Sequence, residues 1–288
     1  MKRNSGAMPT YAKPAVHHKK DLGQHFLYDM ELLRSLVRKA NVAEGDDILE
    51  VGAGAGTLTR ALCETGANVV SVEVDQALLA NLQRMGEEFP NLTIIKSDIR
   101  KLDFSTLPFQ GVFSVVANIP YNITSQILDL FWGKGLQVKQ MSVMVQEEVA
   151  DKLVANPGDK AYGLTSVRAH YYCLTEIAEL VPAAAFTPPP KVDSAFVTLP
   201  FRKAPPLPVE DEAFLWRIVN ASYSMRRKTM QNALKGVLPF PAATFQGILD
   251  ELGLSATVRG ETLSVEQWIT LSNAIVAKTR SCFASPIR

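Results

Sequence analysis

Three glycines at alternate positions are the residues whose spacing has the clearest chemical meaning in this chain. Gly52, Gly54 and Gly56 directly follow the mainly apolar run Ile48–Val51, and apolar residues resume at helical spacing after them. Glycine lets the backbone turn tightly and lets a ligand approach closely, and a following helix offers N–H groups at its N-terminus. The pattern predicts a strand–turn–helix site for a nucleotide-containing cofactor. Glycines that serve only packing would give the same pattern.

The spacing of these glycines separates two kinds of cofactor. The dinucleotide-binding pattern G-x-G-x-x-G would place its third glycine at position 57, which is Thr57 in this sequence. The sequence also offers no plausible hydride-relay histidine, so a nicotinamide-dependent dehydrogenase is the weakest alternative. Residues 50–56 read E-x-G-x-G-x-G, beginning at Glu50, and resemble motif I of S-adenosylmethionine-dependent methyltransferases.

Two acidic residues stand at the ends of later predicted strands. Glu73 lies near the end of the run Asn68–Val74 and 21 residues after Gly52, close to the separation of roughly 20 expected for a carboxylate that accepts from ribose hydroxyls. Asp98 follows the run Leu92–Ile95. Ligands of open α/β sheets bind at the carboxyl ends of the strands, so we expect both acids at the cofactor site. Solvated strand-end acids are the alternative.

Strands and helices alternate along most of the chain, which would bring these motifs to one edge of a sheet. We expect an α/β fold: a Rossmann-like S-adenosylmethionine-dependent methyltransferase sheet with helices on both faces, plus a small C-terminal all-helical domain. The expected strands are 48–51, 68–74, 92–95, 112–117, 141–145, 176–181 and 195–199. The expected helices are one capped by Asp29, one after the glycine turn, one marked by Leu78, Leu79 and Leu82, and those at 125–132, 147–155 and 162–174.

Beyond the proline-rich linker 204–208 the pattern becomes entirely helical. The expected helices there are 214–223, 229–237, 244–252 and 265–277. We therefore divide the chain into a basic, disordered tail (1–20), a methyltransferase domain (21–203) and a helical RNA-binding domain (204–288).

Composition excludes several classes of protein. No apolar run reaches the roughly 18 residues of a membrane span, and no signal-peptide pattern opens the chain. The three cysteines, Cys63, Cys173 and Cys282, form no C-x-x-C pair, which argues against a zinc site or a disulfide framework. We expect a cytoplasmic monomer that binds neither a metal nor a membrane.

The formal net charge of +1 hides an uneven distribution along the chain. Residues 1–20 carry five basic and no acidic residues, 21–200 carry 14 basic and 22 acidic residues, and 201–288 carry 11 basic and seven acidic residues. Two positive ends around an acidic middle suit a polyanionic partner held by the ends. An ordinary solvated tail and a basic surface are the alternative.

Four separated motifs together resemble the ribosomal RNA adenine dimethyltransferase family: GQHFL (23–27), EVGAGAG (50–56), NIPY (118–121) and FTPPPKVDS (186–194). The resemblance runs from about Lys20 to the C-terminus. It is greatest to the small-subunit branch, which is associated with kasugamycin sensitivity. His25 is one departure, because many relatives have asparagine there.

The resemblance implies S-adenosylmethionine as cofactor. It assigns Glu73 to the ribose hydroxyls, Asp98 to the adenine amino group and Glu50 to the amino end of the methionine portion. The full set of implied cofactor-binding residues is His25, Leu27, Glu50, Gly52, Gly54, Gly56, Glu73, Asp98 and Asn118.

NIPY follows a predicted strand and is suited to hold an adenine N6, a poor nucleophile because its lone pair is delocalised into the ring. Acceptors aimed at its two hydrogens would stabilise the charge that develops on the nitrogen. Asn118 offers a side-chain carbonyl, and a main-chain carbonyl near Ile119–Pro120 offers a second. Tyr121 can stack on the base, and by resemblance Phe186 closes its other face. A turn residue and a core tyrosine are the alternatives.

Arg226, Arg227 and Lys228 are the best candidates for phosphate contacts in the helical domain, with a solvated helix end as the alternative. By resemblance, the partner is small-subunit rRNA within a pre-ribosomal subunit, and the reaction is N6,N6-dimethylation of two adjacent adenosines near the 3′ end of the 16S rRNA. Two other functions stay open: a large-subunit methylase of the macrolide-resistance type, and a non-catalytic RNA-binding or transcription-factor relative.

Overall fold

The computed structural model describes residues 24–109, 111–133 and 135–284. The expected basic tail 1–20 lies outside these residues. Contacts divide the chain into two compact units: unit 1 runs to Ile127 and includes Val181–Asp193, and unit 2 comprises Leu128–Leu180 and the chain from Ser194 onward.

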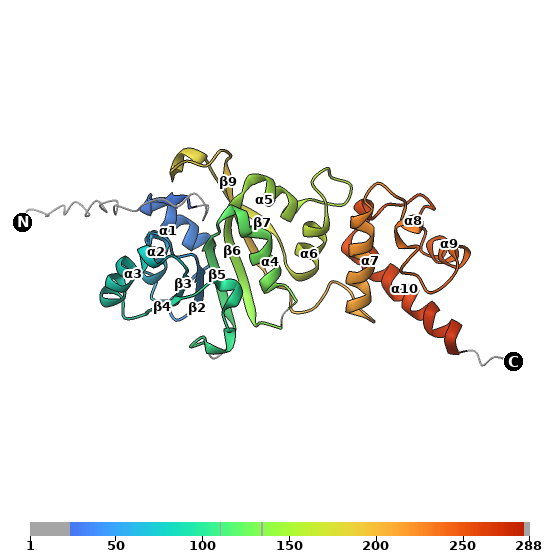
Figure 1. The fold of residues 1–288 in the computed structure, drawn as a ribbon, viewed down its shortest axis with the longest axis horizontal. Helices are drawn as coiled ribbons and strands as arrows, with labels where there is room; N and C mark the ends of the chain where they lie inside the picture. The colour runs from blue at the N-terminus through green and yellow to red at the C-terminus, as the bar shows by residue number, and fades with distance from the viewer. Residues whose placement is uncertain (1–23, 110, 134, 285–288) are drawn as a thin grey trace, which may run out of the picture. The chain divides into compact units, whose positions relative to one another are not determined.

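Four parallel strands form the centre of unit 1 (Figure 1). They are β2 (Asp47–Val51), β3 (Asn68–Glu73), β4 (Leu92–Lys96) and β5 (Phe113–Asn118). Both β3 and β5 pair with β2, on opposite sides, and β4 pairs with β3. From β2 the chain continues to β3 and β4 on one side of the sheet, and then crosses to β5 on the other side of β2. The strand order therefore reverses between β2 and β5. Such a topological switch point is where open α/β sheets bind ligands.

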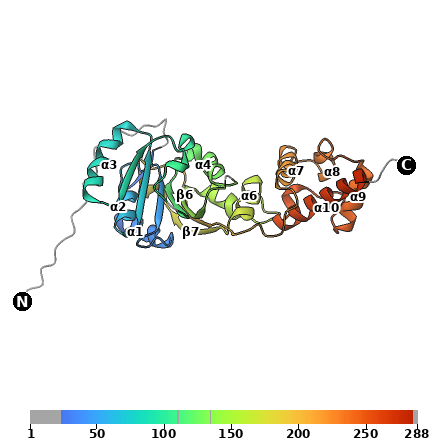
Figure 2. The same cartoon turned by 90° about the horizontal axis from the view of Figure 1, so that it is seen from below.

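The helices of unit 1 connect these strands and pack beside them (Figures 1 and 2). In the first, the carboxylate of Asp29 accepts hydrogen bonds of 3.0 Å from the amides of Glu31 and Leu32, which confirms the predicted N-cap. The helices are α1 (Met30–Lys39), α2 (Thr57–Cys63) and α3 (Gln76–Glu88), and short 3₁₀ helices follow at Ile99–Lys101, Phe104–Thr106 and Tyr121–Ile123.

A second sheet of two very short strands joins distant parts of the sequence. Strand β1 (Phe26–Leu27) pairs antiparallel with β8 (Phe186–Thr187). A two-residue strand has no measurable periodicity, so the sequence pattern predicts neither strand. Within unit 1, the pairing joins residues 26–27 of the GQHFL motif to residues 186–187 of the FTPPPKVDS motif.

Unit 2 continues the alternation with antiparallel strands. Strand β6 (Val138–Gln146) pairs with β9 (Ser194–Pro200) along seven residues, and the order in the larger sheet is β4-β3-β2-β5-β6-β9-β7, where β7 is Glu176–Val181. The helices of this part are α4 (Thr124–Phe131), which begins in unit 1, α5 (Glu147–Val154) and α6 (Leu164–Tyr172). A mixed sheet flanked by helices confirms the predicted fold class.

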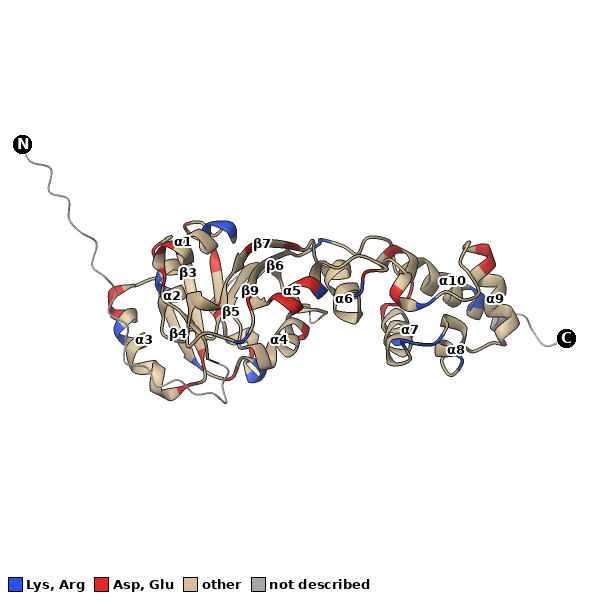
Figure 3. Cartoon of the chain, turned by 90° about the horizontal axis from the view of Figure 1, so that it is seen from above, with Lys and Arg blue, Asp and Glu red and all other residues tan. Residues whose placement is uncertain are grey.

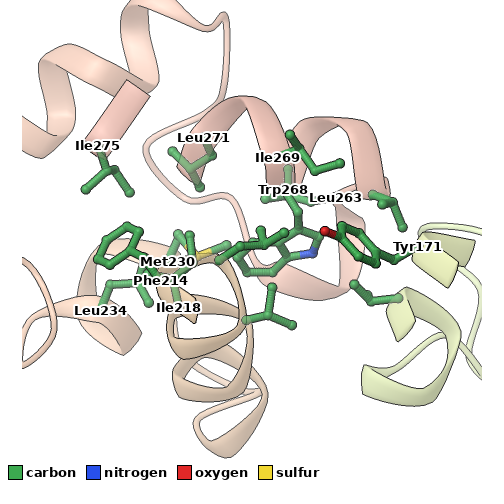
Figure 4. Packing of buried hydrophobic residues seen from close by; sticks show 14 of the residues in the cluster. Tyr171, Phe214, Ile218, Met230, Leu234, Leu263, Trp268, Ile269, Leu271 and Ile275 are labelled. Carbon is green, nitrogen blue, oxygen red and sulfur yellow. The ribbon is translucent and has the colours of Figure 1, made fainter. Parts of the chain in front are cut away.

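The C-terminal helices of unit 2 share one apolar core with α6 (Figure 4). Trp268 is fully buried among side chains of α7 and α8, and Tyr171 of α6 belongs to the same cluster. These helices are α7 (Glu212–Ser224), α8 (Met230–Leu234), α9 (Ala242–Glu251) and α10 (Val265–Ala284). Because this core includes α6, the C-terminal helices belong to the same compact unit as residues that precede position 204. The predicted domain boundary at position 204 stays a prediction.

Two predicted helices differ from the observed ones by three residues or more at one end. The expected helix 229–237 shrinks to α8 (Met230–Leu234), while the expected helix 265–277 extends through α10 to Ala284. Residues 225–228 form a turn that connects α7 to α8. Met225 to Lys228 are all exposed, whereas Met230 at the start of α8 is fully buried.

Candidate functional site

The glycine turn connects β2 to α2 in a conformation that most side chains avoid. Gly52 has φ +76° and Gly54 has φ +57°, both in the left-handed region. A Cβ on Gly54 would lie 2.8 Å from Cε1 of Phe26, whereas one on Gly52 would meet nothing closer than Cδ of Pro120, at 3.9 Å. Gly54 is therefore needed for packing against β1, and Gly52 leaves open space at the turn.

Glu73 fixes this turn from the neighbouring strand. Its Oε2 accepts from the amide of Gly54 at 2.8 Å, and its Oε1 accepts from the amides of Val74 at 2.9 Å and Asp75 at 2.7 Å. The side chain is buried, with 5% of its surface exposed. A carboxylate offers about four acceptor positions, so Glu73 retains capacity for one further donor, such as a ribose hydroxyl.

Glu50 lies below the turn and is fully buried. Its Oε2 accepts from the hydroxyls of Thr59 at 2.7 Å and Ser71 at 2.5 Å, while Oε1 has no hydrogen-bond partner among the described residues. Burial raises its pKa to about 7, against the opposing effect of the two hydroxyls. These contacts tie β2 to α2 and β3; the predicted contact with the methionine portion of the cofactor stays a prediction.

Asp98 follows β4 and is engaged by an arginine two residues later. Nε of Arg100 donates to Oδ1 at 2.9 Å, and Nη2 donates to Oδ2 at 2.7 Å. The Arg100 guanidinium holds the pKa of Asp98 below its usual value, so the carboxylate is charged at neutral pH. Nη1 of Arg100 also donates to Oε1 of Gln126 at 2.9 Å. The sequence analysis did not predict a role for Arg100. Its position two residues after an acid at a strand end was the feature that could have indicated this ion pair.

Asn118 ends β5 with a defined amide orientation. Its Nδ2 donates to the main-chain carbonyl of His25 at 2.9 Å. A carbonyl can only accept, so the nitrogen must face His25 and Oδ1 is the atom left to accept from a ligand. The adjoining Pro120 carbonyl accepts from the amide of Ile123 at 3.1 Å and from the hydroxyl of Thr124 at 3.4 Å. The prediction left open which carbonyl of Ile119–Pro120 is the main-chain acceptor, and that of Ile119 is therefore the better candidate.

Tyr121 and Phe186 differ in accessibility. Tyr121 is half-buried, and its ring stacks on that of His25 with centroids 5.4 Å apart. Phe186 has only 3% of its surface exposed and sits in the pairing of β8 with β1. Its predicted stacking on a base is therefore not visible in this structure and stays a prediction.

The GQHFL segment links the separate parts of the site. Leu27 is buried, and its carbonyl accepts from Oγ1 of Thr57 at the start of α2, at 2.7 Å. One residue earlier, Phe26 packs on Gly54. Contacts thus connect the segment with the glycine turn, Asn118 and Phe186. Thr57, Thr59 and Ser71 are positioning residues that the sequence prediction did not include.

An S-adenosylmethionine molecule fits the character of these residues. Gly52 leaves space where a Cβ would otherwise stand, Glu73 presents a fixed carboxylate, and Asn118 presents a carbonyl oxygen, all at the carboxyl ends of β2, β3 and β5. The turn, Glu73 and Asp98 would hold the cofactor.

The three predicted phosphate-binding residues lie together in unit 2, where Figure 3 shows basic residues at the turn between α7 and α8. All three are exposed. Arg226 is already engaged: its Nε donates to Oε2 of Glu261 at 2.7 Å, and its Nη2 to the carbonyls of Tyr162 at 3.3 Å and Lys160 at 3.4 Å. No described residue pairs with the side chains of Arg227 or Lys228. Arg227 and Lys228 are the stronger candidates.

Two searches within the described residues concern other kinds of site. No group of three or more His, Cys, Asp or Glu side chains is arranged to hold a metal ion. No helix in the same part of the chain is both long and apolar enough to span a membrane.

Comparisons with known proteins identify the family of this chain. The family model for ribosomal RNA adenine dimethylase matches residues 15–276. The chain is 40% identical over 265 residues to a ribosomal RNA small subunit methyltransferase A from Geobacillus sp. (strain WCH70), covering 89% of this chain and 91% of that one. The corresponding protein from Bacillus mycoides (strain KBAB4) is 40% identical over 267 residues, covering 90% and 91%.

Two solved structures are similar over nearly their whole length. A dimethyladenosine transferase from Plasmodium falciparum aligns with a TM-score of 0.76 and 26% identity, covering 88% of this chain and 98% of that one. The 23S rRNA methyltransferase ErmE aligns with a TM-score of 0.69 and 27% identity, covering 87% and 99%. With its turn, its NIPY site and a family match over most of its length, the chain belongs to the ribosomal RNA adenine dimethylase family.

Proposed function

We propose that this protein transfers methyl groups from S-adenosylmethionine to the N6 atoms of two adjacent adenosines near the 3′ end of small-subunit rRNA. The observation that carries the proposal is the orientation of Asn118, whose Oδ1 is left as an acceptor at the end of β5. A donor group on the target is needed there, and the adenine amino group is one. The name shared by the bacterial relatives, small subunit methyltransferase A, supports the choice of rRNA.

The chain's own groups supply positioning and charge stabilisation. Oδ1 of Asn118 and the carbonyl of Ile119 accept from the two N6 hydrogens, which favours a pyramidal nitrogen with its lone pair directed outward. The bound cofactor supplies a methyl group already activated by its sulfonium. As positive charge develops on N6, the same two oxygens stabilise it, an effect typically worth about 2.7–4 kcal/mol per preorganised group. Tyr121 holds the plane of the base by stacking.

The cofactor is held by groups that cannot easily move. Glu73 accepts ribose hydroxyls with its remaining acceptor capacity, and Asp98 accepts the adenine amino group with lone pairs not used by Arg100. Leu27, whose carbonyl accepts from Thr57, closes the site above the turn. The partner is rRNA within a pre-ribosomal subunit, bound in the cytoplasm by a monomer that needs no metal.

Methylation of ribosomal subunits tests the proposal directly. Undermethylated small subunits, incubated with the protein and labelled cofactor, should gain dimethyladenosine in digests analysed by mass spectrometry. Large subunits treated in the same way should gain none. Incorporation of label without any dimethyladenosine would contradict the proposed reaction.

A large-subunit target is the second candidate, and the similarity to ErmE favours it. The same assay decides between the two, because methyl transfer to large-subunit RNA alone would replace the first proposal with the second. A protein that binds RNA and cofactor but methylates neither subunit would instead match the non-catalytic alternative.

A further inference from the structure

The ring of Tyr121 rests on the imidazole of His25. The two centroids are 5.4 Å apart and the planes differ by 22°, a distance and tilt typical of an offset aromatic stack. The face of Tyr121 toward His25 is thus covered, and an adenine can stack only on the other face.

His25 is itself anchored at two atoms. Its Nδ1 lies 2.7 Å from the main-chain carbonyl of Pro188, and since a carbonyl only accepts, Nδ1 carries the proton and donates it to this bond. Its own main-chain carbonyl accepts from Nδ2 of Asn118. The pairing of the adjacent residue Phe26 with Thr187 fixes the same two segments. The imidazole therefore cannot turn away from Tyr121 without losing the Pro188 hydrogen bond.

We propose that His25 is a positioning residue for the target adenine, acting through Tyr121. Its ring is the fixed support that sets the plane of Tyr121, and its carbonyl sets the direction in which Oδ1 of Asn118 points. One residue thus aligns the stacking surface with the hydrogen-bond acceptor. The inference rests on the proposed function and differs from the cofactor contact that the motif resemblance implies for the same residue.

Two substitutions separate the ring of His25 from its hydrogen bond. His25→Asn removes the ring but retains a side-chain donor for Pro188, whereas His25→Phe retains a ring and removes the donor. In His25→Asn we expect kcat/KM for rRNA to fall about two- to tenfold, the value of one aromatic pair, with cofactor affinity by calorimetry unchanged. His25→Phe, which keeps a ring against Tyr121, should retain most of the wild-type kcat/KM. Equal impairment in both variants, or a parallel loss of cofactor affinity, would overturn the inference.

A double-substitution cycle tests whether the effect passes through Tyr121. If His25 acts on the base only by supporting Tyr121, His25→Asn should have almost no further effect on kcat/KM in a Tyr121→Leu background. If His25→Asn lowers kcat/KM by the same factor in the wild-type and Tyr121→Leu backgrounds, His25 does not act through Tyr121.

A spectroscopic measurement tests the contact without relying on activity. The imidazole protons of His25, assigned as the resonances lost in His25→Asn, should shift in Tyr121→Leu because the tyrosine ring current is removed. The resonances of His170, which lies in unit 2, serve as the control. Unshifted His25 resonances would contradict the stack itself. A wild-type protein that methylates no rRNA would contradict the proposed function, whereas wild-type kcat/KM in His25→Asn would contradict only the inference.

Discussion

The glycine-turn site of unit 1 and the basic turn 225–228 of unit 2 offer opposite means of binding the ligands proposed for them. Glu73 is buried and accepts from three backbone amides, so its position is fixed before any ligand arrives. Arg227 and Lys228 are exposed, and their interactions are screened by salt. The first region therefore suits precise geometry, and the second suits attraction to a polyanion irrespective of its sequence. Substitutions in the first should act strongly and individually, and those in the second weakly and additively.

The largest effect should come from the acceptor in unit 1. Asn118→Ala removes the oxygen proposed to stabilise charge on N6, so turnover should fall by about 10²–10³-fold. Cofactor affinity should change far less than turnover. Single-turnover methylation with saturating cofactor measures this effect, and a variant that retains the wild-type rate would show that Asn118 is not an acceptor.

Burial in the same region predicts a pH-dependent stability. The pKa of Glu50 is raised from 4.5 to about 7 in the folded protein. Its contribution to stability is therefore complete below pH 4.5 and is lost as the pH rises through about 7. Between pH 5 and pH 8 the free energy of unfolding should fall by about 2–3 kcal/mol from this group.

Urea unfolding at the two pH values measures this change, and Glu50→Gln is the matched variant because it cannot titrate. The difference between pH 5 and pH 8 should be smaller in Glu50→Gln than in the wild type. An identical pH dependence in both proteins would mean that the buried carboxyl does not titrate in this range.

Glu73 should have a smaller effect, on binding. Glu73→Ala leaves the amides of Gly54, Val74 and Asp75 without their acceptor and removes the proposed ribose contact, so affinity for S-adenosylmethionine should weaken by about 1–3 kcal/mol. Calorimetry with the cofactor and with NADH checks both the effect and the specificity. Unchanged cofactor affinity would remove Glu73 from the site.

The smallest individual effects should come from the basic turn of unit 2. If Arg227 and Lys228 each contact a phosphate, each alanine substitution should reduce the slope of log affinity against log salt by about 0.7–0.9. Arg226→Ala is the matched control, because Glu261 already holds its guanidinium, and it should reduce the slope less.

A salt titration of subunit binding measures the three slopes, with cofactor affinity expected to stay constant throughout. The comparison between the two regions fails if the turn variants change cofactor affinity. It also fails if all three slopes equal that of the wild type, because the basic turn would then be only a solvated surface.

Much of this organisation could be predicted from local sequence. The cap at Asp29, the central strands and the glycine turn each depend on residues within a few positions of one another, through burial periodicity and backbone preference. Local preference failed at two helix ends, where packing decided the outcome: α8 ends earlier than predicted, and α10 continues to Ala284.

The sequence alone determined which groups can do the chemistry, because residue type sets what an amide, carboxylate or guanidinium can donate or accept. Only the tertiary structure decided the orientation of those groups and the partners that they contact. Asn118 is oriented by a carbonyl 93 residues away, and His25 by one 163 residues away. Arg226 is held by Glu261, 35 residues later. These partners are brought together by the packing of whole strands and helices, and no pattern of neighbouring residues specifies them.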